Sequence, residues 1–176
     1  LWYKHEYLRR LDVLINDRKS AIRVGKQSPD EFLVHHARQA LEQLLARGLT
    51  LHLASGTDEH YVVEEAELLG IANCFQGRIY GARDDYQSFS KRMVIERILN
   101  ETGISGDALL AFGDGYVEIE NTKQVGGLAI AIASDEANNG QGNFDPWKRN
   151  RLLDVGADVV IPDYRDIAPL LSALLQ

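Results

Sequence analysis

The sequence contains very little cysteine: Cys74 is the only one in 176 residues. A single cysteine cannot form a disulfide within the chain, so we expect a reducing compartment, with the cytoplasm as the default location. The first residues, LWYKHEYLRR, lack the apolar stretch of a signal peptide. No apolar run approaches the roughly 20 residues that a membrane-spanning helix needs, and we therefore expect no membrane partner.

Positive charge is also scarce. The chain has 19 Lys and Arg against 26 Asp and Glu, which gives a net charge of −7. Nucleic-acid-binding domains present a basic surface because many of their contacts are to phosphates, so we expect no nucleic-acid partner. The hydrophobic content of 45% is normal for a globular core, and the length suits one domain with a small appendage.

Short apolar runs alternate with helical patterns from Leu49 onwards. The predicted strands are Leu49–Ala54, a short piece at Cys74–Tyr80, Leu109–Phe112, Gly127–Ala133 and Asp158–Ile161. The predicted helices between and after them are about Asp58–Leu69, Ser88–Glu101, Asp145–Val155 and Ile167–Leu175. This alternation is typical of βαβ units. The sequence therefore predicts an α/β fold with a Rossmann-like parallel sheet and flanking helices.

The pattern before the first strand is helical. Apolar residues recur near helical spacing over Trp2–Ile15, and the polar stretch NDRKSAIRVGKQ that follows is interpreted as a connection or a short helix. Ser28 is followed by Pro29 and two acids, which is typical of a capped helix start. We expect that helix to run to Arg47, just before a glycine.

The segment LLAFGDGYVE, residues 109–118, carries the clearest chemical signal. Its apolar run ends at Gly-Asp-Gly, as expected for a parallel strand buried on both faces, and ligands in open α/β sheets bind at the carboxyl ends of such strands. Asp114 and Glu118 follow this strand, and two carboxylates in a loop suit Mg²⁺. The alternative is an ordinary turn with two solvated acids.

Further candidates follow other strands. Ser55 and Gly56 precede a predicted helix, where a hydroxyl and free N–H groups form an anion site, although simple helix capping is the alternative. Lys91, early in a helix, offers a compact charge that pairs with phosphate, and an ordinary exposed lysine is the alternative. Asp135–Glu136, in a polar loop after the fourth strand, are further candidates for the metal site.

The order of these motifs resembles the haloacid dehalogenase superfamily of phosphatases. A strand ending in Ser, a helix-borne Lys and a strand ending in Gly-Asp-x-x-x-Glu occur in that order. The resemblance implies that Ser55 holds the phosphoryl group and that Lys91 neutralises phosphate and nucleophile. It also implies that Asp114 and Glu118 hold Mg²⁺.

One motif of that superfamily is absent from the sequence. Its first strand ends in Asp-x-Asp, where the first Asp is the nucleophile and the second is the general acid and base, and no Asp-x-Asp occurs in the chain. Asp12 and Asp17 are the only acids early enough, and their helical surroundings argue against this role. The resemblance therefore implies a partial helical cap in residues 1–28 and the α/β core in residues 29–176, with its first strand missing.

The missing strand would lie mid-sheet, between the strands Leu49–Ala54 and Leu109–Phe112. Both of these would then keep an edge of unpaired N–H and C=O groups, and buried unpaired groups cost about 1–3 kcal/mol each. We therefore expect that the sequence is part of a longer polypeptide. The alternatives are that another chain fills the gap, or that the sheet is rearranged.

The resemblance implies a Mg²⁺-dependent phosphatase that hydrolyses a small phosphorylated metabolite, such as a sugar phosphate or a phosphoglycolate-like compound, through an aspartyl-phosphate. Its nucleophile lies outside the sequence, so the 176-residue chain alone is expected to be inactive. The alternatives are a phosphomutase on the same fold and a non-catalytic phosphate- and metal-binding or regulatory module. The tail DPWKRNRLLDVGADVVIPDY is similar to bacterial phosphatases of which some are fused to sugar kinases, so a kinase is an expected partner.

Overall fold

The strands form two parallel sheets, as seen in a computed structural model that describes residues 2–82 and 90–175. One sheet has the order β1-β2 and the other the order β3-β4-β5, with all pairings parallel. The strands are β1 (Leu53–Asp58), β2 (Ile79–Ala82), β3 (Leu110–Gly113), β4 (Leu128–Ile132) and β5 (Val159–Ile161). The chain therefore has the α/β fold with parallel strands that the sequence predicts.

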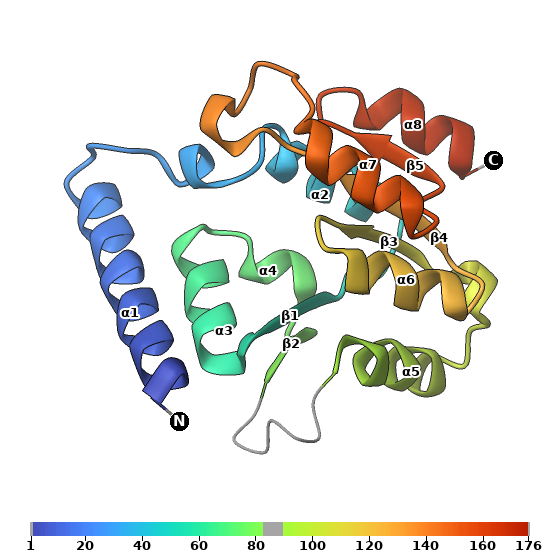
Figure 1. Cartoon of the computed structure of the whole chain (residues 1–176), viewed down its shortest axis with the longest axis horizontal. Helices are drawn as coiled ribbons and strands as arrows, with labels where there is room; N and C mark the ends of the chain where they lie inside the picture. The colour runs from blue at the N-terminus through green and yellow to red at the C-terminus, as the bar shows by residue number, and fades with distance from the viewer. Residues whose placement is uncertain (1, 83–89, 176) are drawn as a thin grey trace.

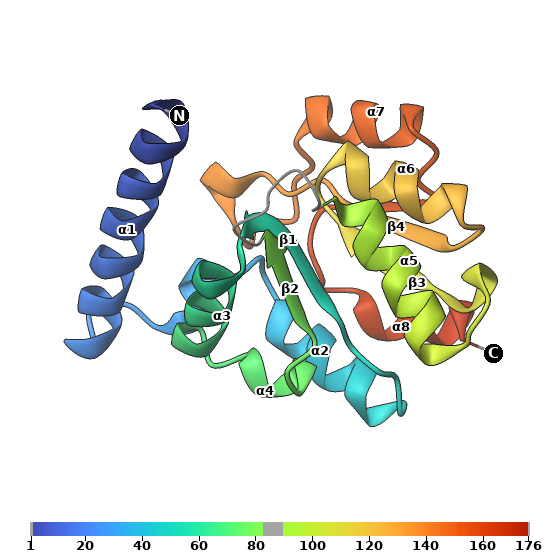
Figure 2. The ribbon, with the colours of Figure 1, turned by 90° about the horizontal axis from the view of Figure 1, so that it is seen from below.

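Helices cover both faces of each sheet (Figures 1 and 2). The α-helices are α1 (Trp2–Arg23), α2 (Ala37–Ala46), α3 (Glu59–Leu68), α4 (Ala72–Phe75), α5 (Lys91–Thr102), α6 (Tyr116–Gln124), α7 (Pro146–Asp154) and α8 (Ile167–Leu174). The 3₁₀ helices are η1 (Pro29–Phe32), η2 (Gly106–Ala108) and η3 (Glu136–Asn138). None of the helices in the described part of the chain combines the length and the apolar character needed to cross a bilayer.

The core has a separate apolar cluster on each face of each sheet. The run LAIAI of β4 is buried on both faces, against Ile119 of α6 and Leu152 of α7 on one side. On the other side, α2 and α8 pack together over β3. The sheet of β1 and β2 lies between α3 and α4 on one face and α5 on the other. Continuous apolar strands are expected in parallel sheets because both faces are covered.

The boundary between the two sheets falls between β1 and β3. Within the described residues, β1 pairs only with β2 and β3 pairs only with β4, so each keeps one edge without a strand partner. In Figure 2 the two sheets lie next to each other with β1 and β3 on facing sides. These are the two strands for which the sequence analysis expects an open edge.

The limits predicted for the first two strands are wrong. β1 begins four residues later than the predicted Leu49–Ala54, so Ser55 lies inside the strand instead of after it. The piece Cys74–Tyr80 is not one strand: α4 ends at Phe75, the capping residue Gln76 has a left-handed backbone with φ 49°, and β2 starts at Ile79. The short helix forms because Phe75 is buried against α3 in the core.

The predicted helix from Ser28 to Arg47 is interrupted. Its capping chemistry is present, since the Glu31 carboxylate accepts a hydrogen bond from the Ser28 N–H at 2.8 Å, but it supports only the short helix η1. The next residues bond elsewhere. Asn139 donates to the Leu33 carbonyl at 2.8 Å and accepts from the His35 N–H at 3.0 Å. These tertiary bonds replace helical ones, and α2 starts only at Ala37.

Two other predicted helices have different starts or ends. The polar stretch after Ile15 continues α1 to Arg23, because Arg18 and Lys19 form ion pairs with Glu65 and Glu64 of α3. Figure 1 shows α1 standing apart from the sheets, beside α3. The helix predicted from Ser88 begins at Lys91, capped by the Ser90 hydroxyl, and the predicted residues before Ser90 lie outside the described part.

Candidate functional site

The turn between β3 and α6 places two acids close together. Asp114 follows the end of β3 with an exposed side chain, and Glu118 lies in the first turn of α6, where the positive end of the helix dipole favours an acid. The Glu118 carboxylate folds back over the turn. A Cβ atom built on Gly115 would come within 2.3 Å of it, so a side chain at this position would displace the Glu118 carboxylate.

Lys91 is the first residue of α5 and faces this turn. Its ammonium forms an ion pair with Glu118, and the two side chains are only 23% and 21% exposed. Burial lowers the pKa of Lys91, and the negative charge of Asp114 opposes this shift. Since a cation is disfavoured at the N-terminus of a helix, helix stability does not explain this lysine.

Gly56 and Lys91 line the same pocket. This pocket has a volume of about 500 Å³ and includes Glu118 and the turn before it. The pairing of β1 with β2 shifts register between Ala54 and Asp58, so Gly56 lies in an irregular part of the strand, with open space above its Cα. Ser55 is half-buried and is not among the residues that line this pocket; its hydroxyl accepts the Thr57 N–H at 3.2 Å.

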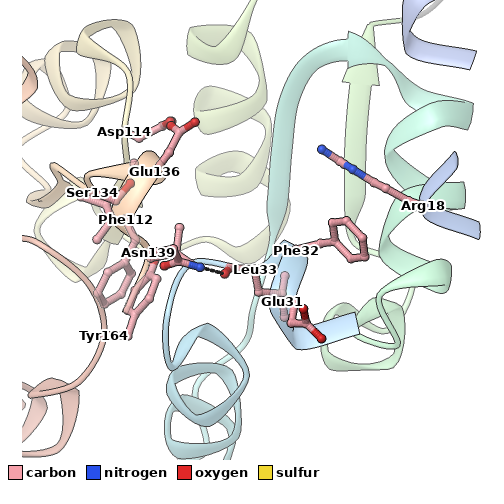
Figure 3. A pocket seen from close by; sticks show the side chains of 13 residues that line it. Arg18, Glu31, Phe32, Leu33, Phe112, Asp114, Ser134, Glu136, Asn139 and Tyr164 are labelled. Carbon is pink, nitrogen blue, oxygen red and sulfur yellow. Dashed lines mark hydrogen bonds between the residues drawn. The ribbon is translucent and has the colours of Figure 1, made fainter. Parts of the chain in front are cut away.

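A second cavity, of about 490 Å³, is lined by Asp114 and the end of β3 (Figure 3). One wall is built from the carboxyl ends of the three-stranded sheet and the loops that follow, with Asp114, Glu136 and Tyr164. The opposite wall comes from α1 and from η1 with the residues after it, and includes Arg18 and Phe32. A pocket at the carboxyl ends of parallel strands is in the position where α/β proteins bind ligands.

Residues 5–126 match the family model of haloacid dehalogenase-like hydrolases. The chain belongs to this family. No curated protein matches the chain.

Solved structures with this hydrolase fold are similar to the chain. A haloacid dehalogenase-like protein of unknown function from Agrobacterium tumefaciens has 20% identity and a TM-score of 0.64, covering 81% of this chain and 61% of its own. A family hydrolase from Deinococcus radiodurans with bound phosphate and sodium has 15% identity and a TM-score of 0.66, covering 81% and 60%. A predicted phosphoglycolate phosphatase from Haemophilus somnus has 17% identity and a TM-score of 0.60, covering 78% and 56%. The chain thus spans about three fifths of their length, and at this identity they show the fold alone.

Sequence reasoning missed two residues that line the cavity. Tyr164 follows β5 much as Asp114 follows β3, so the apolar run ending in Pro-Asp-Tyr was a usable signal. Burial raises the pKa of Tyr164, and the charge of Asp114 raises it further. Arg18 gives no local signal, since it lies in a polar stretch of a helix far from any strand end. Of the two loop acids, Glu136 lines the cavity and Asp135 is not among the lining residues.

The acids of the turn are the candidate ligands for a metal ion. Asp114 lines the cavity, and its side chain makes no hydrogen bond or ion pair with another described residue. The described residues contain no group of three or more His, Cys, Asp or Glu able to hold a metal. Mg²⁺ takes only one or two carboxylates and keeps several waters, so Asp114 fits this ion as a single protein ligand.

Proposed function

We propose that the chain is the phosphate- and Mg²⁺-binding part of a phosphatase that acts on a small phosphorylated metabolite. One observation carries the proposal: a half-buried lysine at the first residue of a helix lies beside the acidic turn at the end of a parallel strand. The membership in a hydrolase family and the phosphate bound to a protein of similar fold support it.

In this proposal, three groups bind the phosphoryl oxygens. The ammonium of Lys91 supplies positive charge, and the backbone of Gly56, in the same pocket, supplies an N–H donor. Ser55 precedes Gly56 in β1 and does not itself line the pocket; because its hydroxyl accepts a hydrogen bond from the Thr57 N–H, its proton remains available for donation to an anion held at Gly56. Donors held at fixed positions stabilise the charge that develops during phosphoryl transfer.

Mg²⁺ would be held by Asp114. When bound, the ion supplies positive charge near the phosphoryl oxygens. The Glu118 carboxylate is paired with the Lys91 ammonium. We therefore propose that Glu118 would contribute to the metal site through a water molecule rather than by direct contact. The pairing with Lys91 also keeps the two charges of opposite sign adjacent when no substrate is bound.

The nucleophile of the proposed reaction lies outside the 176 residues, which contain no Asp-x-Asp. We place it on a strand between the open edges of β1 and β3. Its carboxylate would attack phosphorus in line, forming an aspartyl-phosphate and releasing the alcohol, and water would then release phosphate. The alternative is a non-catalytic module, which would bind phosphate and Mg²⁺ at the same sites but would lack the strand with the nucleophile.

Isothermal titration with inorganic phosphate in the presence of Mg²⁺ tests the proposed site. We expect Lys91→Gln to weaken phosphate binding by about tenfold or more, because a charge-assisted bond is lost. Lys26→Gln, which removes the same charge from an exposed position, should bind phosphate as the wild type does. Equal affinities of the wild type and Lys91→Gln would exclude Lys91 from the phosphate site.

A further inference from the structure

Arg18 enters the cavity from the wall opposite Asp114. It belongs to α1, whereas Asp114 and Glu136 come from the three-stranded sheet and its loops. Figure 3 shows the side chain of Arg18 reaching from its helix toward the wall that carries these two acids. A ligand whose phosphoryl group lies near Asp114 would therefore extend toward Arg18.

The charges that line the cavity are unevenly distributed. Besides Arg18, the charged residues of the described lining are Glu31, Asp114 and Glu136, all acidic. Glu136 is paired with Lys148 at 2.5 Å, and Glu31 accepts the N–H of Ser28. Arg18 is thus the only cation on the described lining, and it is the group there that would attract an anion.

The guanidinium of Arg18 is held in place by two neighbours. It forms an ion pair with Glu65 of α3 and lies over the ring of Phe32, with 5.6 Å between its central carbon and the ring centroid. Its side chain is 33% exposed. An arginine has five N–H donors, so the bond to Glu65 leaves others for a ligand. Because the neighbours already restrict the side chain, little conformational freedom is lost on binding.

We propose that Arg18 recognises a second anionic group, a carboxylate or a phosphate, at the end of the substrate remote from the transferred phosphoryl group. This rests on the proposed phosphatase function and adds a substrate class to it: small phosphate esters with a second negative charge. A cavity of about 490 Å³ is in the size range of small-molecule sites. A guanidinium binds either anion through paired N–H donors.

Binding of two phosphate esters to the full 176-residue chain tests this assignment. Isothermal titrations with Mg²⁺ present would compare 2-phosphoglycolate, which carries a carboxylate, with ethyl phosphate, which has no second charge. We expect the wild type to bind 2-phosphoglycolate about tenfold or more tightly. Arg18→Gln should remove this preference and leave the affinity for ethyl phosphate unchanged. Arg18→Lys keeps the positive charge but loses the paired N–H donors, so this variant should keep only part of the preference for 2-phosphoglycolate.

Lys19→Gln is the matched control. Lys19 is the next residue of α1 and also forms an ion pair with α3, but it is not among the residues that line the cavity. It should keep the preference for 2-phosphoglycolate. Replacing that ligand by ethylene glycol bisphosphate shows whether a carboxylate or a second phosphate is favoured at Arg18.

Three results would overturn the assignment: no binding of 2-phosphoglycolate, no preference in the wild type, or an equal loss of preference in Lys19→Gln. Failure of the underlying phosphate site is separately visible, because Lys91→Gln would then bind ethyl phosphate like the wild type. Another result is also distinguishable: the chain binds ethyl phosphate through Lys91 but shows no preference for a ligand with a second charge. This result would support the proposed phosphate site and exclude only the role of Arg18.

Discussion

The ammonium of Lys91 and the carboxylate of Glu118 meet where the first turns of α5 and α6 come together. The two helices belong to different βα units: α5 follows β2, and α6 follows β3. The ion pair therefore links the half of the molecule that contains β1 and β2 to the half that contains the three-stranded sheet.

Replacement of Glu118 by Gln tests the energetic role of this pair. The amide keeps the shape but removes the negative charge, which leaves the half-buried Lys91 without its charged partner. We expect a loss of about 1–3 kcal/mol in the free energy of unfolding, measured by urea denaturation at pH 7. Glu120→Gln, at an exposed position of the same helix, is the control. A similar small effect in both variants would show that the pair adds no stability.

Parts of the fold whose chemistry is local could be predicted from the sequence. The strand β3 lies where the apolar run before Gly-Asp-Gly predicts it. The helix α7 starts at Pro146 after Asp145, whose carboxylate accepts the N–H groups of Trp147 and Lys148. In these segments, neighbouring residues supply the capping and turn interactions, so a window of a few residues contains the necessary information.

Segments that depend on distant partners could not be predicted. The interruption before α2 depends on Asn139, about a hundred residues away in the chain. The strand β2 contains Gly81, where a Cβ atom would lie 2.3 Å from the Cα of Glu59, a close approach that only the tertiary structure creates. Likewise, Arg18 enters the cavity only because α1 stands beside α3. None of these relationships leaves a local pattern in the sequence.

Asp114→Asn tests the proposed metal site. The substitution keeps the shape and removes the charge that Mg²⁺ favours, so we expect Mg²⁺ affinity to fall at least about tenfold while the unfolding transition changes little, because the carboxylate is exposed. Isothermal titration with Mg²⁺ measures the affinity. Asp135→Asn changes an acid of the neighbouring loop that does not line either pocket and should bind Mg²⁺ normally. Unchanged affinity in Asp114→Asn would remove this residue from the metal site.

Asp158 is expected to contribute to stability in a pH-dependent manner. Burial raises the pKa of its carboxyl, but the hydrogen bond from the Ala129 N–H and the contact with Lys123, at 2.7 and 2.8 Å, outweigh burial and hold the pKa below its ordinary value. A lowered pKa in the folded state means that the contribution is present above the unfolded pKa of about 3.9 and is lost as pH falls through the folded value.

Urea denaturation between pH 7 and pH 2.5 measures this contribution. Asp158→Asn should be less stable than the wild type at pH 7, and the difference should shrink below about pH 4 as the wild-type carboxyl takes up a proton. Asp17→Asn, at an exposed position of α1, should follow the wild type throughout. A difference that stays constant down to pH 2.5 would mean that the charge of Asp158 does not contribute.

Turnover of a phosphate monoester depends on the nucleophile. A polypeptide of only these 176 residues has no Asp-x-Asp, and losing a covalent nucleophile should cost at least the roughly 10²–10⁴-fold that general acid–base catalysis contributes. We therefore expect no measurable release of phosphate from a monoester at saturating Mg²⁺, in a preparation whose intact mass has been verified. A longer polypeptide with an apolar strand ending in Asp-x-Asp should release phosphate, and product analysis would show whether it hydrolyses the ester or transfers the phosphoryl group. Hydrolysis by the verified short chain, abolished in Asp114→Asn, would contradict this and would make Asp12 or Asp17 the first nucleophile to test, although both are exposed on α1 and neither lines the cavity.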